Sequence, residues 1–333
     1  MKKLFFSLAV LAALQITAQP AEQTAQETAR SFMRSGDFDN AVLILNRALQ
    51  NDKSNLDLQK DLALSFYYKR DYAKALEVVE TMLDRNDADI AVYQIGGNVY
   101  KALEAVKDAE KMYKRALKKF PKSGALYSEY GELLWAKKDP EAIEFWERGI
   151  KEDPSYAGNY YNAALYHHST KDKVWSLIYG EVFVNMESLT ERAAAMKGLL
   201  LEGYKEKLFA DADVTAGSEK RSEFAKAYLQ TMGKQTSLLT RGVNADILTA
   251  IRTRFILDWY KSYGSRFPFR LFDYHQQLIR EGMFEAYNQW LFGTVESLPA
   301  YDIWTKTHTE SHTKFTAFQK NRVFRMPGGQ YYQ

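Results

Sequence analysis

A unit of 34 residues recurs along the first half of this 333-residue chain. Alanine stands at positions 41, 75 and 109, and a second series of small residues keeps the same interval: Ala29, Ala63, Gly97 and Gly131. Three positions after each member of the second series comes a large residue, Phe32, Phe66, Tyr100 or Leu134. Small residues let two helices approach closely, and large neighbours fill the space beside the crossing. The repeat therefore predicts helical hairpins that stack on one another.

The third unit carries the fullest version of the pattern. Its marked positions are Tyr93, Gly96, Gly97, Tyr100, Ala109, Tyr113, Ala116 and Pro121, with Gly96 where a leucine is usual. This pattern resembles the tetratricopeptide repeat, a helix–turn–helix unit of the same period. The resemblance covers residues 22–187, about five hairpins. In the fifth unit His167 and Ser176 replace an aromatic residue and an alanine.

The N-terminus predicts export. Lys2 and Lys3 precede an apolar run from Leu4 to Leu14, and Ala18 offers a small residue for cleavage, so residues 1–18 are expected to be a signal peptide. An uncleaved membrane anchor would need about 20 apolar residues. We therefore expect an exported bacterial type of repeat protein, in the periplasm or cell envelope, without a membrane span after cleavage. The chain has no cysteine, which excludes disulfides and thiolate metal sites.

Residues 188–333 continue as helix but lose the repeat. A helix is expected over 191–208, a break at the Gly- and Pro-containing segment 262–269, and a last helix over about 301–321 followed by a frayed tail. Strand-like alternation is not found in the sequence. The predicted fold is all-α: an α-α superhelical solenoid of tetratricopeptide-like hairpins, followed by a helical C-terminal cap or domain.

A search for catalytic patterns gives little. The sequence has no Gly-rich phosphate loop and no Gly-x-Ser-x-Gly elbow, so we expect no catalytic residue and no cofactor. His308 and His312 have helical spacing, but a packed histidine is the commoner outcome, and no metal site is predicted. A basic run from Lys111 to Lys122 has apolar residues interleaved at helical spacing and is interpreted as a solvated helix face.

The resemblance also implies a binding surface. In tetratricopeptide arrays the first helix of each hairpin lines a concave groove, and exposed positions lie between the packing ones. Carried over to this chain, the groove residues are Tyr67, Tyr68, Asn98, Lys101, Glu132, Trp135, Tyr161, Leu165 and His168. Rigid aromatic side chains in a concave surface are typical binding anchors. The net charge of +3, about +1 without the two signal lysines, gives no argument for nucleic acid as the partner.

Three functions stay open from the sequence. The first is an exported, non-enzymatic scaffold that binds a protein or peptide partner in the groove. The second is an enzyme or enzyme subunit, with a metal or acid/base site in the C-terminal region around His275, His308 and His312. In the third the C-terminal helices fill the groove, and the aromatic residues pack within the protein itself.

Overall fold

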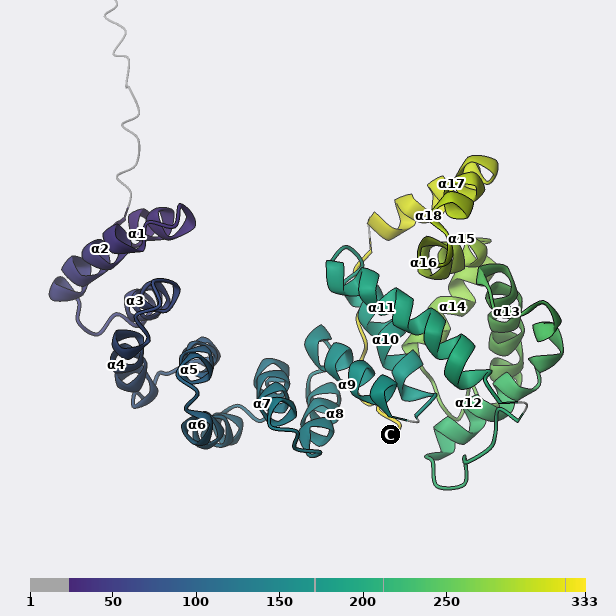
Figure 1. Ribbon diagram of the computed structural model, residues 1–333, viewed down its shortest axis with the longest axis horizontal. Helices are drawn as coiled ribbons and strands as arrows, with labels where there is room; N and C mark the ends of the chain where they lie inside the picture. The colour runs from purple at the N-terminus through teal and green to yellow at the C-terminus, as the bar shows by residue number, and fades with distance from the viewer. Residues whose placement is uncertain (1–23, 171, 212, 321) are drawn as a thin grey trace, which may run out of the picture. The chain divides into compact units, whose positions relative to one another are not determined.

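The computed structural model describes residues 24–170, 172–211, 213–320 and 322–333, and the predicted signal peptide lies outside them. Every regular element in these ranges is a helix, which confirms the all-α fold (Figure 1). The chain divides into two compact units, one ending at Ala88 and the other running from Asp89 to Gln333.

The first unit consists of two helical hairpins. Its helices are α1 (Ala25–Arg34), α2 (Phe38–Asn51), α3 (Leu56–Tyr68) and α4 (Tyr72–Leu83). Thr24 begins α1 with a capping box, in which its side chain accepts from the Glu27 backbone and the Glu27 side chain accepts in return. The small residues of the repeat, Ala29, Ala41, Ala63 and Ala75, have no exposed surface. They lie at the helix crossings that the sequence predicts.

The second unit opens with three further hairpins: α5 (Ile90–Ala102), α6 (Val106–Lys119), α7 (Gly124–Ala136), α8 (Ala142–Glu152), α9 (Ala157–Ser169) and α10 (Trp175–Met186). The close approach at the first two of these crossings needs glycine. A Cβ atom at Gly97 would lie 1.9 Å from the Tyr113 hydroxyl oxygen, and one at Gly131 would lie 2.3 Å from Trp146 Nε1. Large aromatic residues of the second helix thus rest directly on the first.

The hairpin turns repeat as strictly as the helices. Gly36, Arg70, Glu104 and Lys138 follow one another at intervals of 34 residues, and each has a positive φ between 56° and 80°. This left-handed conformation favours glycine, yet only the first turn has one. An aspartate follows in the first two turns, where Asp37 and Asp71 accept hydrogen bonds from backbone N–H groups of the next helix.

Beyond α10 the helices are shorter and less regular. They are α11 (Glu191–Glu202), the π-helix η1 (Gly203–Leu208), α12 (Glu223–Gly233), the 3-10 helix η2 (Thr236–Arg241), α13 (Ala245–Ser262), α14 (Arg270–Arg280), α15 (Phe284–Asn288), the π-helix η3 (Gln289–Gly293), α16 (Thr294–Glu296), α17 (Leu298–Thr307) and α18 (Thr309–Lys320). The expected helix over 191–208 and the expected break at 262–269 are both confirmed.

The expected single helix over 301–321 is wrong, because it breaks at His308 between α17 and α18. Threonine side chains offer the backbone other hydrogen bonds here. The Thr307 hydroxyl donates to the carbonyls of Ile303 and Trp304, and the Thr309 hydroxyl donates to that of Lys306. Such back-bonding competes with a regular helix.

The expected frayed tail is also wrong. Phe324 and Met326 are buried, and the Tyr332 ring stacks on Phe224 with centroids 4.9 Å apart. The Tyr331 hydroxyl donates to Glu147 of α8 over 3.3 Å. Two apolar anchors and two tyrosines in the last residues therefore fasten the tail along the second unit.

Aromatic residues form the core of the C-terminal helices. Phe224 of α12 contacts the rings of Trp259, Phe269 and Phe272 at centroid distances of 5.2 to 6.0 Å. It also stacks on Trp175 of α10 at 5.6 Å. An apolar stripe on α13, which includes Phe255 and Trp259, is buried against this cluster. These helices therefore pack directly on the last predicted hairpin of the repeats.

Candidate functional site

Seven of the nine predicted groove residues lie on consecutive first helices of the second unit, and we call them the first-helix face. They are Asn98 and Lys101 on α5, Glu132 and Trp135 on α7, and Tyr161, Leu165 and His168 on α9. Lys101, Glu132 and Trp135 are exposed, and the other four are partly exposed. The helices that carry them are neighbours, since α7 packs on both α5 and α9.

Polar side chains connect these helices across the face. Asn162 Nδ2 donates to Glu132 Oε1 over 3.0 Å and so links α9 to α7. Gln94 Nε2 donates to Glu129 Oε1 over 2.7 Å and links α5 to α7. Burial raises the pKa of Glu129, although the hydrogen bonds from Gln94 and Tyr113 oppose the shift. The face therefore combines carboxylates, amides and a lysine within reach of one another.

Trp135 is the largest exposed side chain on the face, with 46% of its surface open to solvent. The Tyr166 ring meets it edge-on at 5.4 Å, and Trp146 lies beneath at 6.1 Å. These contacts hold the indole in place while one side stays open. Among the described residues, the C-terminal helices do not cover it.

The α9 end of the face differs, because α11 and η1 reach it. The Arg192 guanidinium lies 5.2 Å from the centre of the Tyr161 ring. His168 Nε2 lies 3.2 Å from Glu202 Oε1, and Lys207 Nζ donates to the His168 carbonyl. Burial lowers the pKa of His168, and the nearby Lys207 adds to the shift. Side chains of α11 and η1 therefore contact this end of the face, where Tyr161, Leu165 and His168 stay partly exposed. The third possibility from the sequence, a groove filled by C-terminal helices, stays a prediction.

Tyr67 and Tyr68 lie on α3 in the first unit. Tyr68 is 55% exposed and stacks on Phe38 at 5.6 Å, and the Tyr67 ring meets Tyr68 edge-on at 5.5 Å. The Tyr72 ring extends this aromatic cluster, with its centroid 5.7 Å from that of Tyr67. Their membership of one groove with Trp135 stays a prediction.

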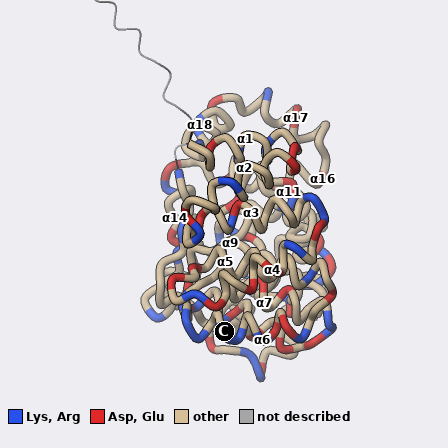
Figure 2. The backbone as a smooth tube through the Cα atoms, turned by 90° about the vertical axis from the view of Figure 1, so that its left-hand side faces the viewer, with Lys and Arg blue, Asp and Glu red and all other residues tan. Residues whose placement is uncertain are grey.

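The basic run on α6 is a solvated helix face, as expected. The exposed lysines of the run on this helix are Lys111, Lys114, Lys118 and Lys119, while Ala109, Met112, Tyr113 and Ala116 on the other side are buried. Acidic side chains accompany the lysines, and Lys137 pairs with Glu110. Figure 2 shows basic and acidic positions mixed along the chain.

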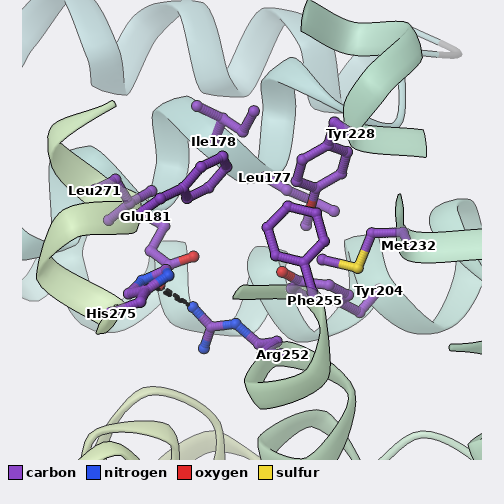
Figure 3. A pocket seen from close by; sticks show the side chains of 11 residues that line it. Leu177, Ile178, Glu181, Tyr204, Tyr228, Met232, Arg252, Phe255, Leu271 and His275 are labelled. Carbon is purple, nitrogen blue, oxygen red and sulfur yellow. Dashed lines mark hydrogen bonds and ion pairs between the residues drawn. The ribbon is translucent and has the colours of Figure 1, made fainter. Parts of the chain in front are cut away.

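The second function open from the sequence is an enzyme with a site around His275, His308 and His312. Of these, His275 lies in a buried polar cluster. Three donors converge on one oxygen, Oε1 of Glu181: Arg252, His275 Nε2 at 2.8 Å and the Tyr287 hydroxyl at 2.6 Å. Arg252 also donates to Asn288. The carboxylate needs a donor from the imidazole, which assigns the neutral ring's proton to Nε2. Figure 3 shows Arg252 reaching toward His275 and Glu181.

The charges of this cluster are compensated internally. The Arg252 guanidinium and His275 outweigh the effect of burial and hold the pKa of Glu181 at about 2. Burial lowers the pKa of His275, so the ring is neutral at pH 7. The hollow beside the cluster measures about 10 Å³ and is lined by residues such as Tyr204, Met232 and Phe255. That space admits about one water molecule and no substrate. The geometry makes this cluster a structural support.

The structure does not bring the three histidines of this enzyme hypothesis together. His308 stacks on Trp304 at 4.9 Å with nearly parallel rings, and His312 meets the same indole edge-on at 6.5 Å. His275 instead packs against Phe284 and Tyr287. Within the ranges that the structure describes, no group of three or more His, Asp or Glu side chains could hold a metal ion.

Comparison with known families identifies the repeats. Residues 27–91 and 96–157 match the sequence model of the tetratricopeptide repeat. These two stretches of the chain are tetratricopeptide repeats. The matched stretches span α1 to the start of α9. The α9–α10 hairpin continues the arrangement beyond the match.

Similarity to individual proteins is more distant. No curated protein matches this tetratricopeptide repeat chain. Among solved structures, YrrB, a TPR protein with an unusual peptide-binding site, is 19% identical over 52% of this chain and 90% of its own, with a TM-score of 0.38. A human IFIT1 dimer with PPP-AAAA is 16% identical over 88% of this chain and 64% of that chain, with a TM-score of 0.41.

Sequence reasoning missed several residues around the tetratricopeptide array. Glu181 and Arg252 were not singled out, although each is a lone charge in an apolar pattern: Glu181 in the run of α10, and Arg252 on the stripe of α13. A charge at such a position needs a buried partner. Glu129 and Asn162 also join the first-helix face, and their signal is a polar residue one turn from a groove position.

In the described part of the chain, no helix is both long and apolar enough to cross a membrane.

Proposed function

We infer that this tetratricopeptide repeat protein is an exported, non-enzymatic scaffold of the cell envelope that binds a protein or peptide partner on its first-helix face. Export rests on the N-terminal sequence, with its two lysines, short apolar run and Ala18. Binding rests on the chemistry of the face itself.

The observation that carries the proposal is the environment of Trp135. An indole that is 46% exposed and fixed by Tyr166 and Trp146 presents apolar surface with little rotational freedom left to lose. Aromatic anchors of this kind dominate binding energies at protein interfaces. The carboxylate of Glu132 and the amine of Lys101 lie on the same face and suit the backbone and charged groups of a peptide.

A scaffold accounts for the C-terminal region better than an enzyme does. Its most polar cluster surrounds Glu181 without room for a substrate, and it joins α10 to α13, α14 and α15. A repeat array exposes an apolar face at its end, and a differently built helical region must cover it. We therefore assign residues 188–333 to capping the array.

Trp135→Ala tests the binding proposal. Mature protein is used to capture partners from envelope extract, and the affinity for the captured partner is then measured with the purified components. The variant should bind at least about fivefold more weakly, because an aromatic anchor contributes 1 kcal/mol or more. Its melting temperature should change little, since the indole is half exposed.

Leu257→Ala is the matched control, because Leu257 is 60% exposed on α13 and lies outside the face. Equal affinity of the wild type and Trp135→Ala would contradict the proposal, as would an equal loss in the Leu257 variant. A large drop in melting temperature for Trp135→Ala would show that the indole supports the fold instead of a partner.

Export has its own test. Mass spectrometry of protein from the native host should show a mature N-terminus at or near Gln19. Retention of Met1 in the membrane fraction would contradict export with cleavage and leave the binding proposal untouched.

A further inference from the structure

A hollow on the C-terminal helices gathers two arginines that lack a carboxylate partner. It measures about 560 Å³ and is lined by Arg270 and Gln277 of α14, Ala317 and Phe318 of α18, and Arg322 just after α18. The hollow opens widely to solvent, so a ligand could enter it without movement of the helices. In the described residues no acidic side chain forms an ion pair with Arg270 or Arg322, whereas Arg252 and Arg266 each have one.

Arg322 is held in an unusual state. Its guanidinium carbon lies 3.9 Å from the centre of the Tyr274 ring and 5.0 Å from that of Phe318. These two rings are within 10° of parallel. Both terminal nitrogens, Nη1 and Nη2, are shielded from solvent, and no described residue accepts a hydrogen bond from them. A guanidinium that loses its water without gaining an acceptor costs free energy.

Arg270 brings the second positive charge to the same hollow. Its guanidinium lies 5.7 Å from the centre of the Phe324 ring, and Phe324 lies 5.5 Å from Tyr274. The two cations are therefore arranged around one aromatic cluster. Burial lowers the pKa of Arg322, and the charge of Arg270 adds to this shift. The repulsion indicates a positive potential that an anion would relieve.

We propose that this hollow binds the oxyanion of a small organic acid, a carboxylate or a phosphate, at the guanidinium group of Arg270, with the positive charge of the shielded Arg322 guanidinium beside it. Guanidinium groups match both oxyanions in geometry and form charge-assisted hydrogen bonds with them. Phe318 and Ala317 supply apolar surface for the body of the ligand. The side-chain amide of Gln277, the remaining lining residue, donates to Glu281 over 2.9 Å.

The test is titration calorimetry of the mature chain at low salt with three probes of one shape: benzoate, phenyl phosphate and neutral benzamide. At least one anion should saturate a single site, and benzamide should not bind. Benzoate binding alone identifies a carboxylate ligand, phenyl phosphate binding alone identifies a phosphate ligand, and binding of both supports the shared oxyanion chemistry. Binding of neither anion overturns the proposal.

Two variants and a control complete the design. Arg270→Met and Arg322→Met should each weaken anion binding at least tenfold. Arg266→Met should bind as the wild type does, because Arg266 also lies over an aromatic ring, 4.9 Å from Phe267, but lines no part of the hollow. Equal weakening in all three variants would show a general charge effect and overturn the site. Should Arg322→Met fail to fold, Arg270→Met decides, since its partly exposed side chain is at the rim.

Discussion

The hairpins α5–α6 and α7–α8 and the helices α12–α15 belong to one unit but are held together in different ways. In the hairpins, glycines at the crossings allow Tyr113 and Trp146 to rest on the neighbouring helix, within one repeat. In the C-terminal helices, Glu181 of α10 is bonded to partners 71, 94 and 106 residues away. Close steric contact stabilises the first region, and a buried polar network fixes the second.

The two regions should therefore respond differently to mutation. A close helix crossing can be repeated along the chain, because each hairpin is stabilised only by contacts within itself and with its neighbours. A buried charge network does not repeat in this way, because each of its side chains depends on hydrogen bonds from all the others. Changes in the network should therefore have larger and less local effects than changes in the repeats.

The largest effect is expected for Arg252→Met. The variant leaves the Glu181 carboxylate buried without its strongest partner, which should lower the free energy of unfolding by about 3–5 kcal/mol. Urea denaturation measures it. The double variant Glu181→Gln, Arg252→Met should lose less than the single one, because no charge is left unpaired.

Arg266→Met is the control for this measurement. Its partner Glu223 lies 3.8 Å away and both side chains are about 60% exposed. An exposed pair contributes about 1 kcal/mol or less. Equal losses in Arg252→Met and Arg266→Met would mean that the polar network does not fix the C-terminal helices.

Acid should weaken the same network in two steps. Burial lowers the pKa of His275 below its ordinary value of 6.5, so its contribution to stability is present above pH 6.5 and is lost as the pH falls below it. Glu181 has a pKa of about 2 against 4.5 when unfolded, so its contribution is lost between pH 4.5 and 2. Thermal melts from pH 8 to 4 should show the first step.

His275→Gln separates the two steps. Glutamine keeps a donor for Glu181 but does not titrate, so the decline in melting temperature just below pH 6.5 should become shallower. An unchanged pH profile would mean that another histidine causes the decline.

A smaller effect is expected in the repeats from Gly97→Ala. The added methyl group overlaps the Tyr113 hydroxyl, and relief by side-chain movement should leave a loss of about 1–3 kcal/mol. Gly198→Ala on α11 is the matched control, because none of the described residues lies within 4 Å of the new carbon. That variant should gain about 0.5–1 kcal/mol from helix propensity. A loss of stability in both variants would mean that the close crossing at Gly97 is not the cause.

The smallest effect concerns the hairpin turn at Glu104. This residue has a φ of 56°, a conformation that costs a non-glycine residue more than glycine. Glu104→Gly should therefore stabilise the protein by about 1 kcal/mol or less, after the entropy of the unfolded glycine is counted. Glu104→Ala should have almost no effect, and a gain equal to that of glycine would show that the side chain, not the backbone, is responsible.

Much of the repeat region could be predicted from sequence. The interval of 34 residues identified Ala41, Ala75 and Ala109 as crossing positions, and all three are fully buried. Such positions are readable because the contacts of a helical hairpin join residues close in sequence, so one local pattern reports both partners. The groove residues were instead implied by the resemblance to tetratricopeptide arrays, and Trp135 among them is 46% exposed.

The C-terminal region could not be predicted in the same way. The sequence predicted a helical cap or domain there, but it gives no sign that Glu181, Arg252 and His275 would meet. The break at His308 and the anchored tail depend on back-bonding threonines and on the contact of Tyr332 with Phe224. Sequence spacing carries no information about such partners.

The sequence by itself thus determined the helical hairpins and their phase, because helix periodicity and close crossings are local, and the resemblance to tetratricopeptide arrays predicted the groove residues. Only the tertiary structure decided which part of the first-helix face stays open and where the buried charges find partners. It also decided that Arg270 and Arg322 share one hollow. These outcomes depend on side chains from helices distant in sequence, whose burial and charge balance are set only when the helices pack.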